Sequence, residues 1–145
     1  MDFSENATKA SMLINDANAK DHITFREFEK IIYLLGYSDC VYPPFYSSLS
    51  DLLDLVQTQT FEVKRDLFYR IIGIRIKFAV EQADNDCPSG ERDEFEQSLK
   101  RLLKMFFEVL QNLEPGNRAI KSILIGIASC SKELRIANLI RDDEG

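Results

Sequence analysis

The chain has 145 residues, of which 45% are hydrophobic and 29% are charged, and its formal net charge is −6 at pH 7. This composition resembles that of an average soluble domain, which excludes a wholly disordered or collagen-like chain, and the length suits a single domain with one core. The negative charge is the wrong sign for binding nucleic acid or anionic lipid through counterion release, so we expect no nucleic-acid partner. No apolar stretch approaches the roughly 20 residues of a membrane-spanning helix, and Asp2 and Glu5 stand where a signal peptide is basic.

The cysteines indicate a reducing compartment and give no sign of a metal site. Cys40, Cys87 and Cys130 are more than forty residues apart, with no second Cys or His at ligand spacing. We therefore expect free thiols and a cytoplasmic protein. His22 is the only histidine, so a Ser-His-Asp or Cys-His arrangement depends on this one residue.

Helical spacing of apolar residues dominates the N-terminal half. We expect a short first helix over residues 4–14 and a second over residues 25–35. Thr24 and Glu27 form a capping box at the start of the second helix, and Gly36 ends it in a left-handed conformation.

The next segment contains two consecutive prolines, Pro43 and Pro44, which predict a rigid aromatic loop over residues 38–47. Beyond it we expect a helix that starts at Ser48 or Ser50. A longer helix follows from Thr60 to about residue 82, although alternating β-branched residues there also fit a strand.

The C-terminal half begins after residues 84–90, the strongest helix-breaking segment. The helix that follows has an acidic first turn and one apolar stripe, formed by Phe95, Leu99, Leu102, Phe106, Leu110 and Leu113.

Asn117 caps the last helical segment, which carries few charges on any face, so we expect Ile123, Leu124 and Ile127 at the centre of packing. Ser131 restarts the helical register, and residues 142–145 form a frayed acidic tail.

Residues 16–36, DANAKDHITFREFEKIIYLLG, resemble the calcium loop and exiting helix of the EF-hand superfamily. Ile23 stands at the eighth loop position, where the family pairs two loops through a short strand. The resemblance implies a helix-loop-helix and calcium ligands at loop positions 1, 3, 7, 9 and 12, which are Asp16, Asn18, His22 (through its carbonyl), Thr24 and Glu27.

Two positions depart from the family pattern. Lys20, at the fifth position, supplies no oxygen ligand and places a positive charge beside the site. Asp21, at the sixth, replaces the glycine of a sharp turn. We therefore expect at most weak calcium binding and no other cofactor. No second hand is recognised, nor does the rest of the chain resemble a known family.

Aromatic residues outside this segment are the candidates for partner contact. Tyr42, Phe45 and Tyr46 belong to the proline-containing loop, and aromatic residues on a rigid loop lose little entropy on binding. Tyr69 and Phe107 lie beside the main apolar stripes of their helices, where they can anchor a partner or a second copy of the chain.

The sequence thus predicts an all-α protein, a compact bundle of five to seven helices in a single domain over residues 1–145. Its parts are an EF-hand-like helix-loop-helix (residues 1–36), a helical bundle (37–141) and the acidic tail (142–145). No phosphate loop or nucleophile motif is present. We expect a non-catalytic protein–protein interaction module, an adaptor or regulatory subunit. A calcium-responsive EF-hand-type module is the alternative, and an enzyme that uses scattered carboxylates is the third.

Overall fold

The computed structural model describes residues 2–20, 22–37, 39–58, 60–61 and 65–144. Within them the chain is an all-α bundle of six α-helices, which confirms the predicted fold class. In chain order the elements are α1 (Ser4–Lys20), β1 (His22–Ile23), α2 (Phe25–Leu35), β2 (Gly36–Tyr37), β3 (Cys40–Val41), α3 (Pro44–Thr58), β4 (Thr60–Phe61), α4 (Arg65–Asp86), the 3₁₀ turn η1 (Ser89–Glu91), α5 (Arg92–Leu110) and α6 (Ala119–Glu144).

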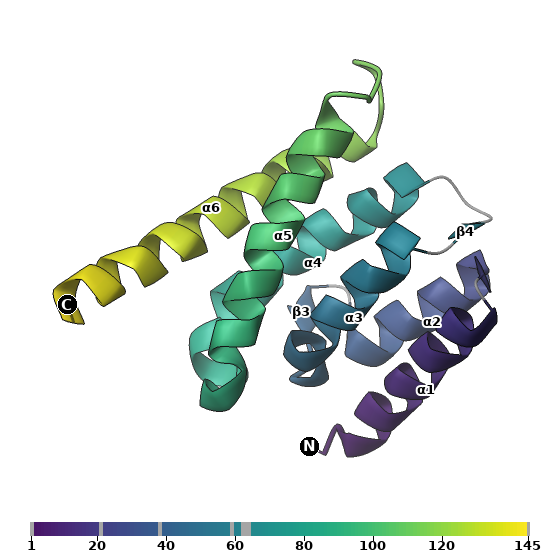
Figure 1. The fold of residues 1–145 in the computed structure, drawn as a ribbon, viewed down its shortest axis with the longest axis horizontal. Helices are drawn as coiled ribbons and strands as arrows, with labels where there is room; N and C mark the ends of the chain where they lie inside the picture. Colours follow the sequence, from purple (N-terminus) through teal and green to yellow (C-terminus); the bar gives the residue numbers. More distant parts are fainter. Residues whose placement is uncertain (1, 21, 38, 59, 62–64, 145) are drawn as a thin grey trace.

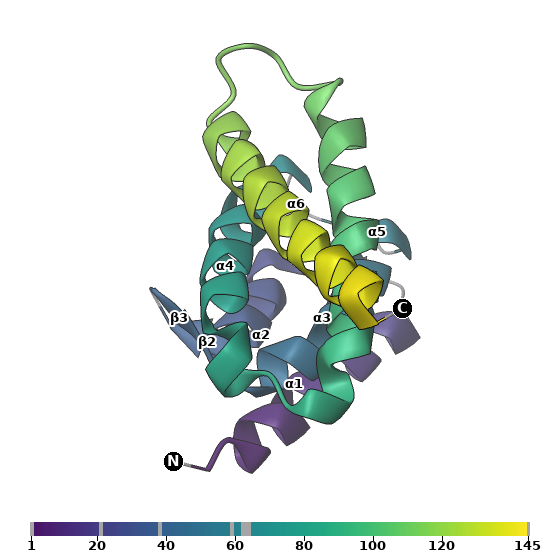
Figure 2. The same cartoon turned by 90° about the vertical axis from the view of Figure 1, so that its left-hand side faces the viewer.

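The helices α1 and α2 lie at one side of the bundle and α6 at the opposite side, with α3, α4 and α5 between them (Figure 1). The helices α5 and α6 are joined by a loop that extends past the end of α4 (Figure 2). No helix within the described residues is long and apolar enough to cross a membrane.

The four strands have two residues each and connect helical units. β1 pairs in parallel with β4, which brings Ile23 opposite Phe61, and β2 pairs with β3 as an antiparallel hairpin. The partner of Ile23 is therefore the segment that follows α3, and not a second EF-hand loop. The pairing joins the turn between α1 and α2 to the segment between α3 and α4.

The structure confirms the helix over residues 25–35 and corrects the boundaries of its neighbours. The first helix continues to Lys20 instead of ending at Ile14, and α3 begins at Pro44 instead of after the aromatic loop. A proline at the first position of a helix loses no hydrogen bond, because that N–H has no partner inside the helix.

Boundaries in the second half also differ from the prediction. Thr60 lies in β4, and α4 begins at Arg65 and ends at Asp86. The last helix runs without a break from Ala119 to Glu144, so Ser131 restarts nothing and residues 142–144 are helical. The predicted cap at Asn117 is confirmed, since its Oδ1 accepts a hydrogen bond from the backbone N–H of Ala119 at 2.8 Å.

Gly36 ends α2, although not through a left-handed cap. Its φ of 175° is extended backbone, which any residue can adopt. Glycine is needed here because the backbone of the β2–β3 hairpin comes very close. A Cβ on Gly36 would lie 2.7 Å from the carbonyl oxygen of Cys40.

Aromatic side chains connect the layers of the core. The ring of Phe28 on α2 packs against that of Phe68 on α4, with 5.4 Å between centroids, and Tyr69 continues the contacts to Phe106 on α5 at 6.0 Å. The apolar stripe predicted for α5 faces this core, because Phe95, Leu99, Leu102 and Phe106 are all fully buried.

The helices α4 and α6 pack most extensively, and small residues make their close crossing possible. A Cβ on Gly73 would lie 2.1 Å from the carbonyl oxygen of Ser122, and one on Gly126 would lie 2.6 Å from the ring of Phe106. The hydroxyl of Ser122 donates to the α4 carbonyl of Arg70 at 2.5 Å.

This crossing corrects the prediction for α6. Ile123 is fully buried and Ile127 is partly buried, but Leu124 is 50% exposed and lies outside the core.

Candidate functional site

The turn between α1 and α2 contains the predicted capping box. The hydroxyl of Thr24 accepts a hydrogen bond from the backbone N–H of Glu27 at 3.2 Å, and the Glu27 carboxylate accepts one from the backbone N–H of Thr24 at 3.2 Å. Two donors that the helix leaves without partners are thereby satisfied, and the direction in which α2 leaves the turn is fixed.

The proposed calcium ligands are spread over three elements. Asp16 and Asn18 lie within α1, because this helix continues through Lys20, while His22 lies in β1. Asp21 lies outside the described residues. Within the described part of the chain, no three His, Cys, Asp or Glu side chains are grouped so as to hold a metal ion.

The carboxylate of Glu27 is engaged by a lysine. The ammonium of Lys20 lies 2.7 Å from its Oε2, and this hydrogen-bonded ion pair holds the pKa of Glu27 below its ordinary value. The Lys20 side chain therefore takes the place of a cation at the carboxylate that would be the bidentate ligand of an EF-hand. Membership of the EF-hand superfamily remains a prediction from the sequence.

Most of the predicted partner-binding aromatics are core residues. Phe45 and Tyr46 are each 1% exposed, and Tyr69 is 7% exposed, so none of the three is available at the surface. Phe45 and Tyr46 are buried because α3 begins at Pro44 and turns them inward. The Tyr46 hydroxyl donates to the carbonyl of Ala79 at 2.7 Å, and burial raises its pKa above the ordinary range.

The other two predicted aromatics are accessible to different degrees. Tyr42 is half-buried and its ring stacks on that of Phe3 with 4.6 Å between centroids, so it fastens the N-terminal segment to the bundle. Phe107 is 49% exposed on α5 and remains a candidate contact residue.

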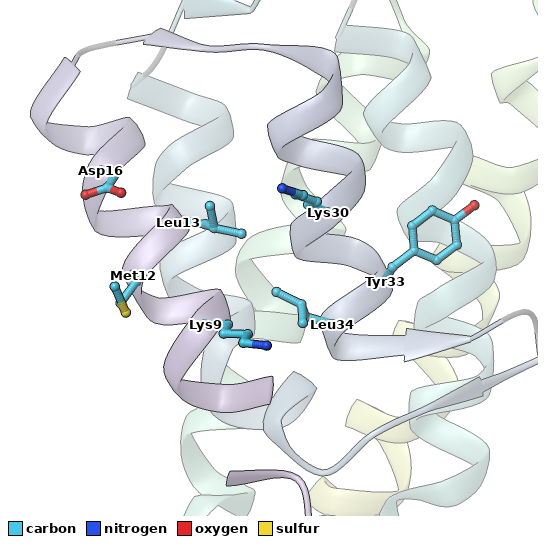
Figure 3. Close-up of a pocket in the computed structure, with 7 residues that line it drawn as sticks. All are labelled: Lys9, Met12, Leu13, Asp16, Lys30, Tyr33 and Leu34. Atoms are coloured by element: carbon cyan, nitrogen blue, oxygen red, sulfur yellow. The ribbon is translucent and has the colours of Figure 1, made fainter. Parts of the chain in front are cut away.

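A groove lies between α1 and α2. Its volume is about 520 Å³, and its lining comprises Lys9, Met12, Leu13, Asp16, Lys30, Tyr33 and Leu34. Figure 3 shows the two helices side by side, with Leu13 and Leu34 between them and both lysine side chains directed into the space that separates the helices.

Two large apolar side chains are exposed along the groove. Met12 on α1 is 59% exposed and Tyr33 on α2 is 57% exposed, and both side chains line the groove together with the half-buried Leu13 and Leu34. The opposite face of α1 buries Ala10 and Ile14, so this helix has an apolar side toward the core and a second one toward the groove. The groove has no clear signal in the sequence, because Met12 and Tyr33 fall outside the buried stripes of their helices.

Ion pairs between helices occur elsewhere in the bundle. The guanidinium of Arg92 on α5 pairs with the buried carboxylate of Glu133 on α6 and lies 3.3 Å from Asp84 on α4. Arg101 on α5 pairs with Asp54 on α3 at 2.7 Å. These contacts join neighbouring helices, which is a structural role.

The thiols differ in their surroundings. All three cysteines are free; Cys130 is fully buried, which raises the pKa of its thiol to about 12, whereas Cys40 and Cys87 are partly exposed. Burial also raises the pKa of Cys87.

Comparison with protein-family models, with curated proteins and with solved structures finds no match for this chain. The groove and its surroundings therefore have to be interpreted from their own chemistry.

Proposed function

We propose that this protein is a non-catalytic helical protein–protein interaction module that binds its partner in the groove between α1 and α2. One observation carries the proposal: Met12 and Tyr33, both more than half exposed, line the same groove from opposite helices. Exposed apolar side chains that gather in one place, with polar residues at the edge, are typical of interaction sites.

The chemistry of the lining supports binding in preference to catalysis. Its side chains are a methionine, two leucines, a tyrosine and three charged residues, so it offers apolar contact together with a few directional charges. Protein–protein interfaces likewise combine apolar contact area with a small number of polar and charged contacts. Tyrosine is among the residues that most often contribute large binding energies at interfaces, and methionine adapts its shape to a partner.

The proposal is tested by two matched tyrosine variants. Tyr33 lines the groove, whereas Tyr37, in β2, is 63% exposed and does not line it. We expect Tyr33→Ala to lose proteins that the wild type recovers from a lysate, because it removes the aromatic contact, and Tyr37→Ala to retain them. Quantitative mass spectrometry of the bound fractions measures the difference, and thermal unfolding verifies that both variants are folded.

The outcome that contradicts the proposal is equally specific. If folded Tyr33→Ala recovers the same proteins in the same amounts as Tyr37→Ala, the groove is not the contact surface of the module.

A further inference from the structure

The shape of the groove limits what can occupy it. It lies between two neighbouring helices that run in opposite directions and meet at the β1 turn (Figure 3). On α1 its lining extends from Lys9 to Asp16, seven residues or about 10 Å along the helix axis. An open, apolar groove between two helices, about two helical turns long, is suited to the apolar face of a third helix, which presents side chains at positions i, i+3, i+4 and i+7.

The charges of the lining oppose the charge of the whole chain. Two lysines and one aspartate give the groove a charge of +1, whereas the chain as a whole carries −6. Lys9 is paired with Glu5 on its own helix at 2.9 Å. Within the described residues Lys30 makes no ion pair, and its ammonium is directed over the leucines of the groove (Figure 3). A partner carboxylate placed there would gain a charge-assisted contact without displacing an existing one.

Resting on the proposed function, we infer that the occupant is an amphipathic helix of a partner protein that carries acidic residues beside its apolar face. Its apolar side chains contact Met12, Leu13, Tyr33 and Leu34, and a carboxylate pairs with Lys30. The two lysines of the lining then set the preference for an acidic partner, while the apolar contacts supply most of the affinity.

Two designed peptides of about 18 residues test this inference. Both carry leucine at helical spacing on one face, and the flanking positions are glutamate in one peptide and lysine in the other. Fluorescence anisotropy measures binding to the intact protein, and amide chemical shifts show where each peptide binds. The chain's net charge of −6 favours the lysine peptide on average over the surface, so a preference for the glutamate peptide has to come from local charges.

We expect the glutamate peptide to bind about tenfold more tightly at low salt, with the largest shift changes in α1 and α2, and we expect the difference to shrink as salt is added. Lys30→Glu should remove most of the preference. Lys104→Glu, the same change of charge at an exposed position on α5, should leave it intact.

The results separate this inference from the proposed function. Equal or tighter binding of the lysine peptide in the groove overturns the acidic preference and leaves the docking surface in place. Shift changes outside α1 and α2 for both peptides contradict the groove itself. Self-association that Tyr33→Ala abolishes would place a second copy of the chain in the groove and would likewise overturn the inference.

Discussion

The close crossing of α4 and α6 makes a sharp prediction about Gly73. Replacing it with alanine adds one methyl group to the middle of α4, at a point where the Ser122 carbonyl oxygen would be 2.1 Å away and the Ser122 Oγ 2.5 Å away. The carbonyl oxygen cannot yield without a shift of α6, because it belongs to the backbone of that helix. The same shift would stretch the hydrogen bonds that the Ser122 hydroxyl donates to the carbonyls of Tyr69 and Arg70.

Two opposing contributions determine how much Gly73→Ala changes the free energy of unfolding. Alanine inside a helix is ordinarily about 1 kcal/mol better than glycine. Against this, overpacking a close contact costs about 1 to 3 kcal/mol, and weakening the one hydrogen bond that the Ser122 hydroxyl proton shares between two carbonyls costs about 1 kcal/mol. We therefore expect Gly73→Ala to lower the free energy of unfolding by about 2 kcal/mol, which for a chain of this size lowers Tm by about 4 to 8 °C.

Urea denaturation followed by circular dichroism measures this difference, with Gly90→Ala as the matched control. Gly90 lies in the 3₁₀ turn η1, and a Cβ there would meet nothing within 4 Å. The control should be neutral or more stable by up to about 1 kcal/mol, since alanine restricts the unfolded chain. A Gly73→Ala variant as stable as Gly90→Ala would refute the close crossing.

Three further predictions concern packing, thiol reactivity and calcium. Ile123→Ala should cost about 2 to 5 kcal/mol in chemical denaturation, and Leu124→Ala less than about 1 kcal/mol, because only the first side chain is fully buried; equal losses would contradict the orientation of α6. Iodoacetamide should modify the other two cysteines of the native protein before Cys130, whose thiol is buried and has a pKa of about 12, and mass spectrometry of the digested protein measures the order. Titration calorimetry should show no calcium binding tighter than about 0.1 mM, because Lys20 already neutralises the Glu27 carboxylate; a micromolar transition that Glu27→Gln abolishes would overturn this expectation.

The parts of the fold that the sequence predicts correctly depend on local signals. The capping box at Thr24 needs only Glu27 three residues later, and the cap at Asn117 needs only the first turn of its own helix. The sequence also predicts the buried side of α5, because the other positions of this helix are mostly charged or polar. In such segments the side that faces the core is fixed before any neighbouring helix is considered.

The prediction that Leu124 is buried was wrong, because contacts between distant segments decide which side of α6 faces the core. The apolar residues of α6 surround the helix, so their pattern does not select a buried side. The selection comes from Gly126 and Ser122, which let α6 approach Phe106 and Gly73 closely and thereby turn Leu124 toward solvent. The loop predicted over residues 38–47 was wrong for a different reason. Pro44 can begin a helix as readily as it can interrupt one, and the choice depends on how the segment packs against the core.

The groove between α1 and α2 also arises from the packing of separate elements, which the local sequence does not show. Each helix needs one apolar side to pack on the bundle, and α1 meets this need through Ala10, Ile14 and Ala17. Met12 and Tyr33 are surplus to that packing, and each taken alone is an ordinary exposed apolar residue of the kind found on most protein surfaces. They become a candidate site only because the short β1 turn returns α2 alongside α1, so that both side chains line one shared groove, into which Lys30 is directed (Figure 3). Recognition by this protein is therefore expected to depend on the pairing of two helices, so that a substitution that separates α1 from α2 should abolish binding even where every residue of the lining is retained.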